Sequence, residues 1–309
     1  MSSTQQNIQP KKGAKPYILS LAQERILRAA HFYRFLSAQD FTTLFYSSSS
    51  LTYVRALLSE LCGAEDFKTN QYLYRFKNGS TRIYSLGAKG RRYLSTELGL
   101  PADWYFRPHK LKYLLSYSQT DHNLSLTRFL IAAQSWAKKQ TNYRIAEMRI
   151  CYELAQTARL IETETLGKTE NIIPDAWILV EKRSNGQHER FMPVLLELDR
   201  GTEHQRRFKQ HVASRIAYIQ SGAYRERFHT NACVIAYVTT GQTPEYRETR
   251  RKAMCRWTME VLADLQIENW ASIFRICSVV PNELYSTPLF DAPIWHKPDS
   301  ATPVTLFSP

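Results

Sequence analysis

Val194-Leu195-Leu196-Glu197-Leu198-Asp199-Arg200-Gly201-Thr202-Glu203 is the stretch on which the interpretation of the whole chain depends. It is typical of an apolar strand that ends in two acids. Because alternate side chains of a strand face opposite sides of a sheet, Glu197 and Asp199 should share one face, with Leu196 and Leu198 on the other. Two acids on one face repel each other unless a cation or a basic side chain lies between them. We therefore expect a charged site at the end of this strand.

Two further acids lie on earlier segments that we expect to be strands. Asp175 follows Pro174, and Glu147 lies on the segment before that. The predicted elements of this part are a helix that starts at 121, strands over 143–150, 172–180 and 191–199, a helix over 202–221, a strand over 233–239, a helix over 245–265 and a strand over 272–280. This order resembles the core of the PD-(D/E)xK nucleases, which implies an α/β fold with a mixed sheet flanked by helices.

The resemblance also implies a metal site, because those nucleases hold Mg²⁺ with an acid on the second strand and another at the end of the third. Mg²⁺ prefers oxygen ligands, and the bound ion activates water for attack on a phosphate. Asp175 matches the first acid and Glu197 the second, and Glu147 is a candidate third ligand. We therefore predict a Mg²⁺ site formed by these three carboxylates.

The pattern departs from active nucleases two residues after the second acid, where lysine is replaced by Asp199. Lys209 or Arg215 on the following helix could supply the missing base, since each flanks the predicted core stripe. The candidate catalytic residues are Asp175, Glu197, Asp199, Lys209 and Arg215. Two interpretations stay open: a working metal-dependent DNA endonuclease, or a fold that keeps its acids for structure or metal binding. Asp199 could also be a turn or helix cap, and Asp175 a strand-entry residue.

Three histidines are interpreted as residues without a catalytic or metal-binding role. His122, beside Asp121 and Asn123 at the start of the predicted central helix, is interpreted as a capping or packing residue. His204 and His211 lack the four-residue spacing of a helical metal pair, so we expect both to be solvated.

The first hundred residues predict a winged helix-turn-helix. Helical spacing of apolar residues indicates three helices, with Ser37 and Asp40 forming a capping box and the serines 47–50 offering a cap for the third helix. An Asn78-Gly79 turn between two β-prone runs indicates a hairpin. In such a domain the third helix enters the major groove and the hairpin reaches the flanking backbone. The candidate DNA-binding residues are Ser50, Thr52, Tyr53, Arg55, Lys68, Arg75, Lys77 and Arg82.

Composition supports a polyanionic partner. The 309-residue chain has a formal net charge of +13, and a basic soluble protein attracts nucleic acid at physiological salt. Residues 1–110 hold sixteen basic and seven acidic residues, so this first third of the chain carries most of the surplus. An alternative is that this winged helix is only a protein-interaction module. Five scattered cysteines and short apolar runs lead us to expect a cytoplasmic protein without a membrane segment.

We divide the chain into five segments. These are a disordered basic tail over 1–16, a winged helix-turn-helix domain over 17–98, a linker over 99–120, a nuclease-like α/β domain over 121–280 and an extended Pro-rich tail over 281–309.

Taken together, these motifs resemble the replication-relaxation family of plasmids and other mobile elements. The residues that carry the resemblance are the winged helix, His122-Asn123-Leu124, Pro174-Asp175, Leu196 to Glu203, and Tyr218 three residues after Arg215. The resemblance implies binding of duplex DNA in replication or transfer, with relaxation of supercoiled DNA as an associated activity. Expected partners are duplex DNA, other replication or mobile-element proteins, and a second copy of the chain. The alternative is a non-enzymatic accessory or regulator whose second domain mediates dimerisation or recruits a partner.

Overall fold

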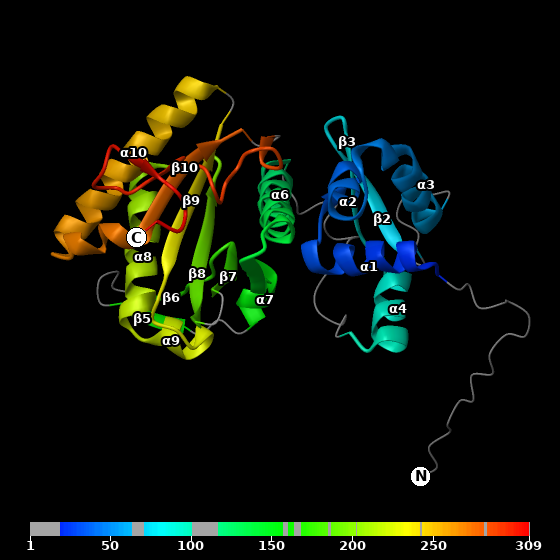
Figure 1. Cartoon of the computed structure of the whole chain (residues 1–309), viewed down its shortest axis with the longest axis horizontal. Coiled ribbons are helices and arrows are strands. Elements are labelled where there is room, and N and C mark those ends of the chain that lie inside the picture. The colour runs from blue at the N-terminus through cyan, green and yellow to red at the C-terminus, as the bar shows by residue number, and fades with distance from the viewer. Residues whose placement is uncertain are drawn as a thin grey trace, which may run out of the picture.

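The computed structural model describes residues 19–63, 71–100, 117–156, 160–163, 168–184, 187–201, 203–241, 243–280 and 283–308. Its helices and strands form two units, the N-terminal unit (residues 19–100) and the C-terminal unit (residues 117–308), which lie side by side with one long helix between them (Figure 1). The mixed α and β content and the two-part arrangement agree with the predicted fold class.

The N-terminal unit combines helices with a small antiparallel sheet of strand order β1-β3-β2. Its elements are α1 (Leu21–Tyr33), β1 (Leu36–Ser37), α2 (Ala38–Phe45), the 3-10 turn η1 (Ser48–Ser50), α3 (Leu51–Cys62), β2 (Leu73–Asn78), β3 (Thr81–Leu86) and α4 (Ala88–Leu98). Three helices followed by a hairpin is the order that the sequence predicts.

Local hydrogen bonds explain where α2 begins, but not where α3 begins. Ser37 forms the predicted capping box of α2 with Asp40, which satisfies backbone N–H groups that have no partner within the helix. The prediction for α3 was wrong in one detail. Serines 48–50 form a 3-10 turn, and the side chain of Ser50 makes no capping hydrogen bond.

The hairpin of β2 and β3 turns at the predicted Asn78-Gly79 pair. Asn78 pairs with Thr81 in register, and Gly79 adopts a φ of 59° that glycine reaches without a steric penalty. The same register sets Lys77 directly opposite Arg82. Both of these cations are exposed.

The C-terminal unit is built on a seven-stranded mixed sheet of strand order β12-β11-β10-β9-β8-β7-β4. Its elements are α6 (Tyr117–Lys139), β4 (Tyr143–Ile150), α7 (Cys151–Gln156), β5 (Leu160–Thr163), β6 (Lys168–Asn171), β7 (Ala176–Ser184), β8 (Gln187–Asp199), α8 (Gln205–Gln220), α9 (Ala223–Phe228), β9 (Val234–Thr240), α10 (Pro244–Asp264), the 3-10 turn η3 (Glu268–Ile273), β10 (Phe274–Val279), β11 (Trp295–His296) and β12 (Pro303–Val304). Strands β8, β9 and β10 run parallel, and the other pairs are antiparallel.

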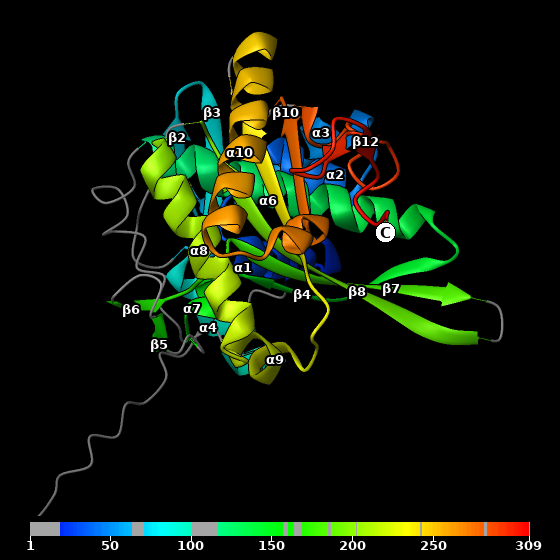
Figure 2. The same cartoon turned by 90° about the vertical axis from the view of Figure 1, so that its left-hand side faces the viewer.

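Helices cover both faces of this sheet (Figures 1 and 2). Leu196 and Leu198 of β8 join the apolar cluster on the side of α6, whereas Leu195 joins the cluster formed with α8 and α10. The predicted alternation along β8 is therefore confirmed. Glu197 and Asp199 follow Leu195 at two-residue steps and face the side of α8 and α10.

The two units share one apolar cluster and several hydrogen bonds along α6. Thr127 on α6 donates from its hydroxyl to the carbonyl of Phe35 at 3.1 Å. At the hairpin turn, Asn78 Nδ2 donates to Asp121 Oδ1 at 2.8 Å. Asp121 lies inside α6, which begins at Tyr117, so the predicted start of this helix at 121 was wrong. Its carboxylate instead connects the units.

The segment after β10 is not the extended tail that its prolines predict. Strands β11 and β12 add to the sheet, and the side chains of Trp295 and Leu306 are fully buried in the core. Trp295 also donates from Nε1 to the carbonyl of Leu289 at 2.6 Å. Apolar anchors spaced along an irregular segment hold it against the sheet without any periodic pattern.

Some predictions fall on parts of the chain outside the described residues. These are the basic tail over 1–16, most of the linker over 99–120, and Lys68. Within the described parts, none of the helices combines the length and apolar character needed to cross a membrane.

Candidate functional site

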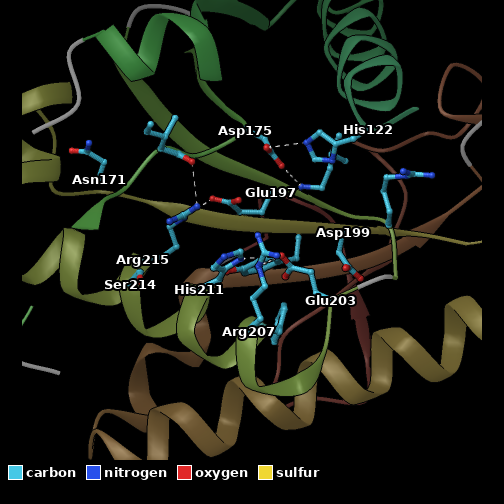
Figure 3. A pocket seen from close by; sticks show the side chains of 15 residues that line it. His122, Asn171, Asp175, Glu197, Asp199, Glu203, Arg207, His211, Ser214 and Arg215 are labelled. Carbon is cyan, nitrogen blue, oxygen red and sulfur yellow. Dashed lines mark hydrogen bonds and ion pairs between the residues drawn. The ribbon is translucent and has the colours of Figure 1, made fainter. Parts of the chain in front are cut away.

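A polar pocket of about 390 Å³ lies where β8 ends and α8 begins. Figure 3 shows its side chains arriving from α6, from the segment before β7, from β8 and from α8. The residues that line it are His122, Asn171, Ile173, Asp175, Glu197, Leu198, Asp199, Arg200, Glu203, Arg207, Phe208, His211, Ser214, Arg215 and Tyr237. Four of the five candidate catalytic residues thus line one pocket, and the fifth, Lys209, does not.

Asp175 bridges α6 and β8 across the pocket. Its Oδ2 accepts a hydrogen bond from the backbone N–H of Leu198 at 2.7 Å, and its Oδ1 lies 3.0 Å from Nε2 of His122. Burial alone would lower the pKa of His122, but the hydrogen bond with Asp175 and the charges of Asp175 and Glu197 outweigh it and raise this pKa. The interpretation of His122 as a capping or packing residue was therefore incomplete, because His122 forms an ion pair with Asp175.

Glu197 is paired with Arg215 in the buried wall of the pocket. Arg215 Nε lies 2.5 Å from Glu197 Oε1, and these side chains are only 8% and 11% exposed. The same guanidinium donates to the carbonyl of Ile173 at 3.4 Å. Burial lowers the pKa of Arg215, but the contact with Glu197 and the nearby charge of Asp175 outweigh it and raise this pKa. Arg215 therefore stays charged and reaches inward, as one of the two predicted bases.

Asp199 has buried partners of its own. Arg250 of α10 donates to both carboxylate oxygens, from Nε at 2.8 Å and from Nη2 at 3.1 Å. Thr239 on β9 donates its hydroxyl to the same carboxylate at 2.9 Å. A bidentate guanidinium pair with a third donor holds the carboxylate in one orientation.

The turn between β8 and α8 is held from the side of α10. Tyr246 donates its hydroxyl to the carbonyl of Gly201 at 2.5 Å. Gly201 has a φ of 76°, and a Cβ at this position would lie only 2.7 Å from the Tyr246 ring. Both the backbone angle and the close ring therefore require glycine here. This explains why glycine stands at position 201 in the stretch from Val194 to Glu203.

A further ion pair lines a more exposed part of the pocket. His211 Nδ1 lies 3.3 Å from Glu203 Oε1, so the prediction that His211 is merely solvated was incomplete. Burial raises the pKa of Glu203, but the hydrogen bond and charge of His211 outweigh it and lower this pKa. Nearby, the hydroxyl of Tyr237 is buried and has no hydrogen-bond partner within the described part of the chain.

The sequence does contain a signal for these side chains. Arg207, His211 and Arg215 follow one another at four-residue steps on α8, directly beside the buried core stripe of Phe208 and Val212. Residues at this spacing lie on one face of a helix. Basic residues that lie beside the buried residues of a helix are placed to reach the edge of the sheet that the helix covers, where a site can form.

Two predicted site residues lie apart from the pocket. Glu147 on β4 pairs with Arg149, whose Nε lies 2.5 Å from its carboxylate, and it does not line the pocket. Lys209 on α8 turns toward α10, where its Nζ lies 2.7 Å from Glu260. Glu147 therefore does not complete a three-carboxylate set with Asp175 and Glu197.

The residues present do not fit a resident Mg²⁺. The described residues contain no group of three histidine, cysteine or acidic side chains arranged to hold a metal ion. Asp175 and Glu197 already accept backbone or charged donors, and Arg215 carries a positive charge beside Glu197. Two like charges about 4 Å apart repel by about 4 kcal/mol at an effective dielectric constant of about 20. Because a divalent cation carries two charges, it would face about twice that repulsion from Arg215, about 8 kcal/mol.

The ion pair of His122 predicts a pH dependence. Because the folded pKa of His122 is raised above its usual value near 6.5, its contribution to stability is full below that value and is lost as pH rises through the folded pKa. Asp175→Asn should lower the pKa of His122 in the folded protein and reduce this loss. Histidine C–H chemical shifts followed by NMR against pH would measure it. An unchanged His122 pKa in the variant would show that the pair does not form in solution.

A second candidate surface lies on the N-terminal unit, where α3 meets the hairpin. Arg55 of α3, Arg75 of β2 and Arg82 of β3 all act on the phenol of Tyr84, whose pKa burial raises and these three charges lower. Three guanidinium groups from three elements therefore lie near enough to one residue to influence its pKa. On α3, the predicted Thr52 is exposed, Ser50 is partly exposed, and the side chain of Tyr53 is 51% exposed.

Comparison with known proteins gives one finding. The family model described as replication-relaxation matches residues 27–233, which is more than half of the chain and includes parts of both units. No curated protein and no solved structure matches the chain. The matched range contains α3, the hairpin, His122, Asp175 and the whole stretch from Val194 to Glu203. The chain therefore belongs to the replication-relaxation family.

Proposed function

We propose that this protein binds duplex DNA of a plasmid or other mobile element through its N-terminal unit and acts there in replication or transfer. The observation that carries the proposal is the cationic surface formed by Arg55, Arg75, Lys77 and Arg82 at the junction of α3 and the hairpin. Family membership supports the setting, since it associates the chain with replication.

The pairing within the hairpin favours an anionic partner. Lys77 lies directly opposite Arg82 in the β2–β3 register, and neither has an acidic partner within the described part of the chain. Like charges directly opposite each other destabilise a two-stranded pair. A phosphate backbone would compensate both charges at once. Binding of a polyanion would therefore relieve the repulsion between Lys77 and Arg82 that the free protein carries.

The exposed face of α3 is suited to base contacts beside that backbone contact. Tyr53 and Thr52 project from the helix, and the buried residues Val54 and Leu58 hold its opposite face against the core. In a winged helix-turn-helix, this helix enters the major groove while the hairpin follows the flanking strand. The predicted DNA-binding residues therefore have separate roles, with α3 reading the groove and the hairpin binding phosphates.

The C-terminal unit supports an accessory role better than metal-dependent cleavage. Its candidate acids are held by His122, Arg215 and Arg250 instead of by an open ligand set. Within this proposal the C-terminal unit positions a partner or a second copy of the chain. Cleavage of DNA with Mg²⁺ is the alternative function.

The DNA-binding proposal predicts that Arg55→Glu together with Arg82→Glu lowers affinity for duplex DNA by about tenfold or more. Each lost phosphate contact should also reduce the slope of log affinity against log salt by about one. Fluorescence anisotropy with a labelled duplex, repeated at several salt concentrations, measures both quantities.

The matched control is Arg225→Glu, because Arg225 is an exposed arginine on α9 in the other unit. It makes the same change in charge at one site without touching the proposed surface. Equal losses in Arg225→Glu and in a single Arg82→Glu variant would show that net charge alone causes binding. A wild-type affinity that is flat across salt would rule out phosphate contacts.

A further inference from the structure

Arg215 lies where a metal-dependent nuclease would need a cation. Its guanidinium reaches from α8 to Glu197 of β8, with Asp175 across the same pocket (Figure 3). We propose that Arg215 is the built-in counter-ion of the Asp175–Glu197 pair, so that the pocket keeps these two acids without a bound divalent cation. This inference is independent of the DNA-binding proposal, because it concerns only the C-terminal unit.

The local fold fixes Arg215 in that position. Its neighbour Ile216 is fully buried in the cluster between α8 and the sheet, which sets the rotation of the helix. The parallel pairing of β8 with β9 places Glu197 opposite Tyr237 on the face that α8 covers. A side chain that is 8% exposed between these elements has little freedom to leave. The ion pair is therefore part of the packed interior.

The other charged side chains of the pocket are consistent with Arg215 taking the place of a bound cation. The strand position that carries lysine in active nucleases carries Asp199 here, and Arg250 neutralises it from α10. A second cation is therefore needed for Glu197, and α8 supplies it. Asp175 receives its own donors from His122 and the Leu198 N–H. Each acid thus has a partner encoded in the chain.

This arrangement meets the requirement that the sequence predicts, namely that a cation or a basic side chain balances the acids that share one face of the strand. A buried carboxylate pair without either would suffer mutual repulsion and desolvation. An arginine meets the requirement permanently, because its guanidinium does not lose its proton in proteins. A metal site, in contrast, would fill and empty with the supply of the ion.

The experiment measures Mn²⁺ binding to the full chain by the loss of the free-ion EPR signal. Wild-type protein should show no saturable site that depends on Asp175. Arg215→Ala should gain one, with affinity at least about tenfold above any residual wild-type binding, because the competing positive charge is gone. The gained site should disappear in Arg215→Ala combined with Asp175→Asn. Arg215→Lys, which keeps the charge, should behave as the wild type.

Arg207→Ala is the matched control, because it removes another arginine of the same pocket whose side chain is 70% exposed and pairs with Glu203 instead of Glu197. It should not create a Mn²⁺ site. Saturable wild-type binding that Asp175→Asn abolishes would overturn the proposal. A folded Arg215→Ala variant that binds no Mn²⁺ would overturn it as well.

A stability measurement covers the case in which Arg215→Ala does not fold. Glu197→Gln combined with Arg215→Gln removes both charges and keeps side chains of similar length. If Arg215 acts as the counter-ion of Glu197, this double variant should be more stable to urea than Arg215→Gln alone. A double variant that is no more stable than the single one would contradict the pairing.

Discussion

Asp199→Ala is expected to lower the free energy of unfolding by about 3–5 kcal/mol, because it leaves Arg250 charged and buried without its partner. The side chains of Asp199 and Arg250 are 3% and 8% exposed, so little solvent can replace the lost contact. The hydroxyl of Thr239 loses its acceptor at the same time. Urea unfolding followed by circular dichroism measures the change.

The control for this prediction replaces both members of the pair. Asp199→Ala with Arg250→Met removes the unpaired charge while keeping apolar bulk against Trp257, over whose ring the guanidinium lies at 5.0 Å. Replacing a buried pair by apolar residues is often close to neutral, so the double variant should recover a large part of the loss. If Asp199→Ala instead left stability unchanged or raised it, Asp199 would be an acid kept for function at the expense of the fold.

Trp295→Ala should also be strongly destabilising, with a loss of about 3–5 kcal/mol in the free energy of unfolding. Trp295 is fully buried on β11, among the largest side chains of the core. Its removal creates a cavity and takes away the hydrogen bond to the carbonyl of Leu289. Urea unfolding followed by far-UV circular dichroism measures the loss, and a single cooperative transition in the wild type is the expected baseline.

Trp295→Phe separates packing from the hydrogen bond, because it keeps most of the aromatic volume and removes the indole N–H. It should cost clearly less than Trp295→Ala, with about 1 kcal/mol for the lost hydrogen bond. A stability unaffected by Trp295→Ala would mean that residues 283–308 detach before the rest unfolds. The segment would then behave as the tail that its prolines suggest.

The sequence predicts the order of elements well because the signals are local. The capping box at Ser37, the Asn78-Gly79 turn and the alternation along β8 each depend on residues within a few positions of one another. Strand β4 was predicted with the bounds that the structure shows, Tyr143–Ile150. Periodicity and turn chemistry are sufficient for such elements.

The site could be predicted only in part, because its charges are balanced by distant residues. The sequence grouped Asp175 and Glu197 with either Lys209 or Arg215 as the base, and the structure brings Arg215 but not Lys209 into the pocket of these two acids. It could not show that Arg250, about fifty positions beyond Asp199, is the partner of that acid. It also grouped Glu147 with the other acids, although the position of Glu147 on β4 leaves it next to Arg149. Pairing across a sheet or between helices leaves no fixed spacing in the chain.

The C-terminal segment failed to match its prediction for a different reason. Prolines and the lack of periodicity are typical of an extended chain. Neither feature indicates whether individual side chains along that chain are buried. Leu289, Trp295 and Leu306 are anchors at irregular intervals, and the stretches between them have little regular structure. Only a count of large apolar residues after Pro281 would have favoured packing over extension.

The short strands β11 and β12 have a consequence for solubility. They pair beside β10, whose residues Phe274 to Val279 are largely buried and rich in β-prone side chains. Without β11, one side of β10 would present unpaired N–H and C=O groups, which recruit strands of other molecules into aggregates. Shortened versions of the chain that stop after Val279 should therefore precipitate, even where each remaining helix and strand can still form.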